Sequence, residues 1–160
     1  MAGSPSERVH DVFSTSGLTL GCAESLTGGL VAAAVTDVAG SSAFFTGGIV
    51  SYWPSVKEDV LGVPASVTSE HGVVSRECAV AMADGAARVL GCDVAVSTTG
   101  IAGPGGAERG KPVGTVWIAV HTPSSTTARL LRATGDRAEV RRAAVNAALE
   151  FVLDALSDGA

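Results

Sequence analysis

Short apolar runs alternate regularly along this chain with longer segments of helical periodicity. Apolar runs suited to strands occupy residues 18–23, 44–51 and 93–99, and helical segments separate them. Two further runs, residues 114–121 and 128–132, flank a polar turn, which favours a hairpin. This order predicts an α/β fold: a single three-layer α/β/α domain with a mixed β-sheet.

Capping residues mark the ends of the expected helices. Ser4 with Glu7, and Asp136 with Glu139, have the spacing of a capping box, and Ser75 precedes another helical segment. The pattern is weaker between residues 56 and 72, where it favours a short helical turn and then a connector with one more turn. The main helices are expected at residues 5–16, 30–38, 76–90 and 137–156.

Length and charge limit what the chain can do. Its 160 residues are 46% hydrophobic, enough for one core, and we expect a single domain over residues 1–160. Eleven Lys and Arg against sixteen Asp and Glu give a net charge of −5. This charge argues against nucleic acid or an anionic membrane as a partner. Any phosphate must therefore be held by local groups.

No apolar stretch reaches the roughly 20 residues of a membrane span, and the amino terminus lacks the pattern of a secretory signal. We therefore expect a cytoplasmic protein. Cys22, Cys78 and Cys92 show no CxxC spacing and are interpreted as buried thiols in a reducing compartment. No cluster of His, Cys, Asp or Glu has metal-ligand spacing, so we expect neither a metal nor another cofactor.

The first candidate for chemistry is Ser25, at a turn between an expected strand and helix. The N–H groups of Thr27, Gly28 and Gly29 follow it and could hold an anion or the oxyanion formed when the serine attacks a carbonyl. Plain capping of the helix by Ser25 or Thr27 explains the same spacing and is the simpler interpretation.

A nucleophilic serine needs a base, and two groups could supply one. Lys57 follows Tyr52 by five residues after a strand end, and a desolvated lysine can act as a base while the tyrosine orients or relays the proton. His71 is a further candidate, whereas His10 and His121 fit structural or solvent-facing positions. A surface lysine and an exposed tyrosine remain the plainer alternative.

The second candidate is a glycine-rich loop, residues 100–111. It lacks the GKS or GKT of a P-loop and the GxGxxG of a dinucleotide turn. Its glycines could let backbone N–H groups converge on an anion, helped by basic side chains, or the loop could simply be a surface connector. The residues expected at a phosphate are Gly103, Gly105, Gly106, Arg109, Lys111 and Arg137.

Taken together, five segments carry a resemblance that no single one carries. In chain order they resemble the CinA carboxy-terminal domain family, and the match extends to the Gly-Asp-Arg at residues 135–137. Trp53-Pro54 stands where many relatives have a small residue and Asn. The segments are AESLTGG at residues 23–29, GSSAFFTGGIVSY at 40–52, HGVVS at 71–75, TGIAGPGG at 99–106 and KPVGTVW at 111–117.

This resemblance implies an amidohydrolase with Ser25 as nucleophile and Tyr52 and Lys57 as its activating partners. The family includes enzymes that hydrolyse the carboxamide of nicotinamide mononucleotide to the acid and ammonia in pyridine-nucleotide salvage. It also implies a homo-oligomer and a stand-alone form, without the amino-terminal pterin-binding-like domain of some relatives. The competing hypotheses are a nucleotide-binding or protein-interaction module without turnover and, less favoured, a phosphotransferase using the glycine loop.

Overall fold

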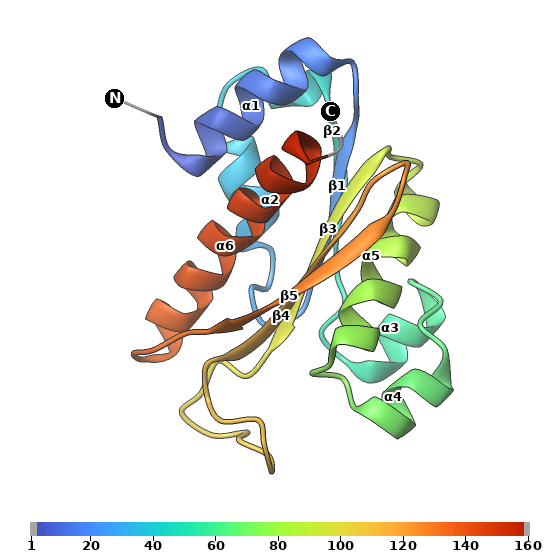
Figure 1. Ribbon diagram of the computed structural model, residues 1–160, viewed down its shortest axis with the longest axis vertical. Helices are drawn as coiled ribbons and strands as arrows, with labels where there is room; N and C mark the ends of the chain where they lie inside the picture. The colour runs from blue at the N-terminus through green and yellow to red at the C-terminus, as the bar shows by residue number, and fades with distance from the viewer. Residues whose placement is uncertain (1–2, 159–160) are drawn as a thin grey trace.

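A mixed five-stranded sheet forms the middle layer of the protein (Figure 1). The computed structural model describes residues 3–158. The sheet has the order β2-β1-β3-β4-β5, in which β2, β1 and β3 are parallel and β4 and β5 are antiparallel to their neighbours. Its strands are β1 (Leu20–Glu24), β2 (Phe45–Val50), β3 (Val94–Gly100), β4 (Thr115–His121) and β5 (Thr126–Arg132).

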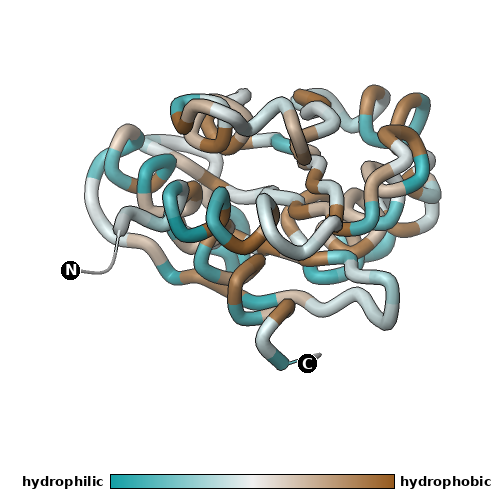
Figure 2. The backbone as a smooth tube through the Cα atoms, turned by 90° about the horizontal axis from the view of Figure 1, so that it is seen from above, coloured by the Kyte–Doolittle hydropathy of each residue, from teal (hydrophilic) through white to brown (hydrophobic). Residues whose placement is uncertain are grey.

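Helices cover both faces of this sheet, which confirms the predicted three-layer α/β/α domain (Figure 1). Figure 2 shows hydrophilic and hydrophobic residues alternating along the helical coils, the pattern of helices that bury one face. One face carries α1 (Pro5–Ser16), α2 (Leu30–Thr36) and α6 (Arg137–Ser157), and the other carries α3 (Pro54–Asp59), α4 (Ala65–His71) and α5 (Arg76–Leu90), while a 3-10 helix covers Ser41–Ala43.

The capping residues act as the sequence predicted. Both capping boxes are present, Ser4 with Glu7 and Asp136 with Glu139, and the Ser75 hydroxyl accepts from the Cys78 N–H. The connector predicted after residue 64 is instead the two-turn helix α4. This helix buries none of its residues and has no side-chain cap. Its sequence therefore shows neither the apolar periodicity nor the capping residue from which a helix is predicted.

All three cysteines are buried free thiols, as predicted. Burial raises the pKa of each of these thiols, for Cys78 to about 11. Within residues 3–158, no helix is long and apolar enough to cross a membrane.

The three parallel strands place their carboxyl ends at one edge of the sheet. Glu24, the last residue of β1, pairs with Val50 of β2 and with Thr98 of β3. Ser25, Tyr52 and the glycine-rich loop therefore begin at neighbouring positions of this edge, where ligands usually bind in open α/β sheets.

Candidate active site

A pocket of about 280 Å³ opens at this edge of the sheet. It contains residues from all three of the loops that the sequence singled out. Its lining consists of Ser25, Leu26, Tyr52, Lys57, Val73, Val74, Thr99, Gly100, Ile101, Ala102, Gly103, Gly105, Gly106, Glu108 and Arg137.

At the base of the pocket, the Lys57 amine donates to the Ser25 hydroxyl, with Nζ and Oγ 3.0 Å apart. Nζ also donates to the carbonyl of Ser51 at 2.6 Å and to that of Tyr52 at 3.3 Å. Lys57 stands on α3, which begins at Pro54 and turns the chain back under the end of β2. Two consecutive backbone carbonyls therefore hold the amine beside the serine hydroxyl.

Lys57 is one of the few buried charged side chains of the protein, with only 1% of its surface exposed. Burial lowers the pKa of its ammonium below the usual value, because desolvation disfavours the charged form. The bonds from Nζ satisfy the polar atom that this burial would otherwise leave alone. The interpretation of Lys57 as a surface lysine is therefore wrong.

Tyr52 contacts the lysine through its backbone rather than through its ring. Its side chain is 53% exposed, and its hydroxyl accepts from Nη2 of Arg137 at 3.2 Å. Nη1 of the same guanidinium donates to the carbonyl of Gly103 at 2.9 Å. Arg137 thus links the tyrosine to the glycine-rich loop across the mouth of the pocket.

The turn that carries the serine, residues 25–29, is called the serine turn. Gly28 and Gly29 adopt positive φ values of 57° and 107°, which other residues rarely accept, and Gly29 is the N-cap of α2. The capping interpretation of Ser25 and Thr27 is therefore wrong. The Thr27 hydroxyl lies 2.7 Å from that of Thr98, which ties the turn to β3.

The expectation that the N–H groups of Thr27, Gly28 and Gly29 are free is wrong for Gly28 only, because the N–H groups of Thr27 and Gly29 have no acceptor among residues 3–158. The Gly28 N–H donates to the carbonyl of Ser25 at 3.1 Å. The N–H groups of Val31 and Ala32 at the start of α2 donate to the Glu24 carboxylate at 2.7 and 3.1 Å. The positive end of the helix therefore faces a buried glutamate of its own chain.

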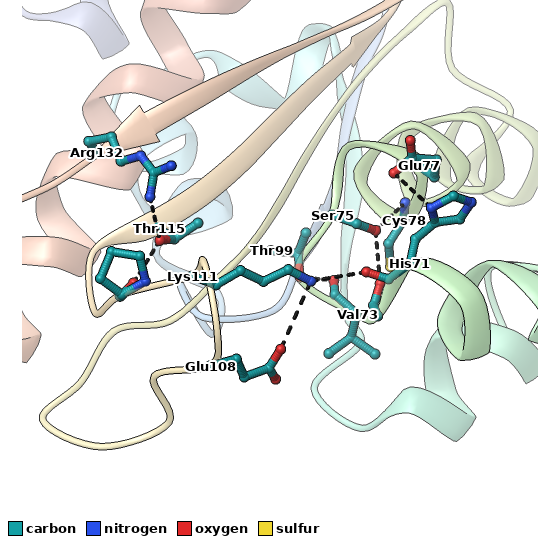
Figure 3. Close-up of polar contacts among 12 residues, drawn as sticks. His71, Val73, Ser75, Glu77, Cys78, Thr99, Glu108, Lys111, Thr115 and Arg132 are labelled. Carbon is teal, nitrogen blue, oxygen red and sulfur yellow. Dashed lines mark hydrogen bonds and ion pairs between the residues drawn. The ribbon is translucent and has the colours of Figure 1, made fainter.

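The glycine-rich loop contributes three of its predicted binding residues, Gly103, Gly105 and Gly106, to the pocket lining. Arg109 and Lys111 do not belong to that lining. Figure 3 shows the Lys111 amine reaching the backbone carbonyl of His71, 3.0 Å away, with the Glu108 carboxylate 3.9 Å from it.

Residues placed away from the pocket include the remaining candidates for a base. His71 pairs with Glu77 at 3.7 Å, and none of the histidines of residues 3–158 lines the pocket. Trp53 is 70% exposed and also lies outside the lining, where with Pro54 it begins α3. Trp53 and Pro54 therefore form the start of α3 and do not belong to the pocket lining.

Sequence reasoning missed two residues that organise this site. Glu24 is 1% exposed, and a carboxylate at the end of an otherwise apolar buried strand was a signal that it has an internal partner. Arg141 of α6 donates to the carbonyls of Leu26 and Thr27 in the serine turn. Nothing in the local sequence announces that contact, because its partners lie more than 110 residues away.

Fold and site together define the class: an α/β protein with a buried lysine amine against a serine hydroxyl at the carboxyl edge of its sheet. The chain belongs to the CinA C-terminal domain family, whose model matches residues 3–156. Among curated relatives, a CinA-like protein of Mycobacterium sp. (strain MCS) is 48% identical over 144 residues, covering 89% of this chain and 34% of the relative.

Solved structures of the same superfamily share the whole fold. A CinA superfamily protein of Klebsiella pneumoniae has a TM-score of 0.93 and 35% identity, with 96% of each chain covered. The competence/damage inducible protein CihA of Agrobacterium tumefaciens has a TM-score of 0.89 and 39% identity, again with 96% of each chain covered. The chain spans about a third of the length of the curated relatives it matches.

Proposed function

We propose that the protein is an amidohydrolase that converts nicotinamide mononucleotide to nicotinate mononucleotide and ammonia, in pyridine-nucleotide salvage. The observation that carries this proposal is the 3.0 Å contact between the buried Lys57 amine and the Ser25 hydroxyl. The family to which the chain belongs includes amidohydrolases, which supports the reaction class.

The surroundings of Lys57 suit a base. A neutral amine has two N–H bonds and one lone pair. If the two N–H bonds point to the carbonyls of Ser51 and Tyr52, the lone pair is left to accept the proton of the Ser25 hydroxyl. The lowered pKa increases the fraction of neutral amine at a given pH.

The reaction then follows in two stages. Ser25 Oγ attacks the carboxamide carbon while its proton passes to Lys57 Nζ, which forms a tetrahedral intermediate. As that intermediate collapses, Lys57 returns the proton to the departing nitrogen, ammonia leaves, and an acyl-serine ester remains. Water, deprotonated by the same amine, cleaves the ester to release the acid and restore Ser25.

Arg137 supplies positive charge for an anionic nucleotide, and the one carboxylate among the described lining residues, Glu108, is paired with the Lys111 amine at 3.9 Å. Among the described lining residues, Arg137 and Lys57 are the only basic ones, and of these two only the Arg137 side chain is always charged. Gly103, Gly105 and Gly106 also line the pocket, where their backbone groups are open to a ligand. In this proposal these groups hold the phosphate, with Tyr52 beside them. The net charge of −5 gives no general attraction for such a ligand, so binding depends on these local contacts.

The direct test is incubation of the purified protein with nicotinamide mononucleotide, with ammonia and nicotinate mononucleotide measured in the same samples. We expect equal amounts of both products, and none from Ser25→Ala. Calorimetric binding of the nucleotide without release of ammonia would contradict the proposal and would favour a binding module that has the fold without turnover.

A further inference from the structure

Arg141 of α6 makes a two-point contact with the serine turn from the face of the sheet that also carries α2. Its Nε donates to the carbonyl of Leu26 at 2.9 Å and its Nη2 to that of Thr27 at 3.2 Å. Arg141 stands one turn after Arg137 on α6. One face of this helix therefore reaches both the mouth of the pocket and the backbone directly after Ser25.

Other bonds fix the remaining peptide groups of the same turn. The Ser25 N–H donates to the carbonyl of Thr98 at 3.0 Å, and the Ser25 carbonyl accepts from the Gly28 N–H at 3.1 Å. The peptide plane between Ser25 and Leu26, which contains the Leu26 N–H, is therefore held by the Gly28 N–H. The Gly28 N–H in turn shares a peptide plane with the Thr27 carbonyl, which Arg141 Nη2 holds, so Arg141 fixes the direction of the Leu26 N–H through Gly28.

The Leu26 N–H itself has no acceptor within residues 3–158, and the same holds for the Thr27 N–H. Both residues are buried, with exposures of 4% and 0%. Buried backbone N–H groups are nearly always paired, so an unpaired one beside a nucleophile needs an explanation. Leu26 also lines the pocket beside Ser25, the residue that the proposed reaction makes the nucleophile.

The helix end does not account for these two donors. The N–H groups at the start of α2 are already bonded to Glu24. Leu26 and Thr27 precede the N-cap residue Gly29 and belong to the turn, not to the helix.

We propose that Arg141 is a positioning residue that holds the serine turn so that the Leu26 N–H donates to the oxyanion of the tetrahedral intermediate. This inference rests on the proposed serine amidase. An N–H group directly after the nucleophile stabilises charge that develops only in the transition state. Arg141 itself touches neither the substrate nor Ser25 Oγ; it acts through the two carbonyls.

Arg141→Ala should lower kcat by about 10- to 100-fold and leave KM nearly unchanged, because an oxyanion donor acts in the transition state. Arg141→Lys should recover only part of this loss, since one ammonium cannot reproduce the planar two-point contact. Arg142→Ala is the matched control: it removes the same charge from the next, exposed position of α6, outside the pocket lining.

A second readout separates this inference from the identity of the substrate. A small alkyl fluorophosphonate would phosphonylate Ser25: the Oγ–P bond forms, the P–F bond breaks, fluoride leaves and Lys57 takes the hydroxyl proton. Negative charge grows on the phosphoryl oxygen during this step, so the same N–H group should accelerate it. The labelling rate, followed by intact mass, should fall about 10-fold or more in Arg141→Ala and stay unchanged in Arg142→Ala.

The outcomes are distinct. Slow labelling in Arg141→Ala with a wild-type melting temperature supports the positioning role, even if nicotinamide mononucleotide gives no ammonia and that substrate is rejected. Equal labelling rates in wild type and Arg141→Ala overturn the positioning role and leave the amidase intact. A wild-type protein that neither labels nor hydrolyses overturns both. Should Arg141→Ala fail to fold, a wild-type kcat in folded Arg141→Lys would overturn the positioning role.

Discussion

The two sides of the pocket differ in how firmly their atoms are held. On the serine side, Lys57 and Thr27 are buried, and hydrogen bonds from β3, α3 and α6 fix the serine turn. On the glycine side, residues 104–110 are exposed in an unbroken run. We infer that the serine side performs the chemistry, which needs atoms fixed within a fraction of an ångström. The exposed glycine side recognises the part of the ligand far from the reacting bond, which needs less precise positions.

Arg137 bridges these two sides, since it contacts Tyr52 after β2 and Gly103 in the glycine-rich loop. If this division of roles holds, substitutions on the serine side should affect kcat and substitutions on the glycine side should affect KM. Arg137 should affect the choice between substrates.

The largest effect is expected from Ser25→Ala, which removes the proposed nucleophile. Ammonia release should fall below detection, while the melting temperature changes little because Ser25 does not cap α2. Product formation and thermal unfolding of the same preparation check both parts. Retention of more than a tenth of the wild-type kcat would remove Ser25 from the nucleophile's role.

Lys57→Met should lower kcat by about 10²- to 10⁴-fold, since a base acts in the transition state, with a much smaller change in KM. Steady-state kinetics with nicotinamide mononucleotide measures both constants. A normal kcat with a raised KM would instead show that Lys57 binds the substrate.

The pH profile tests the same lysine in the wild type. Burial lowers the Lys57 pKa, and the neutral amine is the active form, so activity should increase as pH rises through that lowered pKa. Measurement of kcat/KM from pH 6 to 10 tests for this increase. An activity that falls over this range would mean that the charged ammonium is required.

Arg137→Gln should reduce kcat/KM for nicotinamide mononucleotide by roughly 10- to 100-fold, the cost of losing a charge-assisted hydrogen bond to phosphate. Nicotinamide riboside, which has no phosphate, should be affected much less. Arg142→Gln serves as the control on the same helix. Equal losses for both substrates would mean that Arg137 only links Tyr52 to Gly103.

A small effect is expected from Lys111→Ala, a few-fold loss in kcat/KM that is equal for mononucleotide and riboside. Its amine is bonded to the His71 carbonyl and lies 3.9 Å from Glu108, so the variant loosens the loop without removing a residue of the pocket lining. Arg109→Ala, also outside the lining, should behave like wild type. A loss confined to the mononucleotide would instead place Lys111 at the phosphate, as the sequence suggested.

Local patterns in the chain were sufficient for most of the fold. Capping boxes at Ser4 and Asp136 located two helix starts, and the alternation of strands and helices predicted a three-layer domain with a mixed sheet. These features are short-range. A cap and its partner lie three residues apart, and the apolar pattern of a strand spans only about six or seven residues. Where a helix lacked a cap and a buried face, as α4 does, the prediction fell short.

The burial and the contacts of the side chains in the site depend on packing between residues far apart in the chain. Ser25 and Lys57 are 32 positions apart in the chain, and each had a plain alternative until the fold placed the lysine amine, buried, against the serine hydroxyl. Arg141 meets its two carbonyls across more than 110 residues. Burial, and with it a lowered pKa or a fixed peptide plane, depends on what the whole sheet and its helices surround, so no local pattern can encode it.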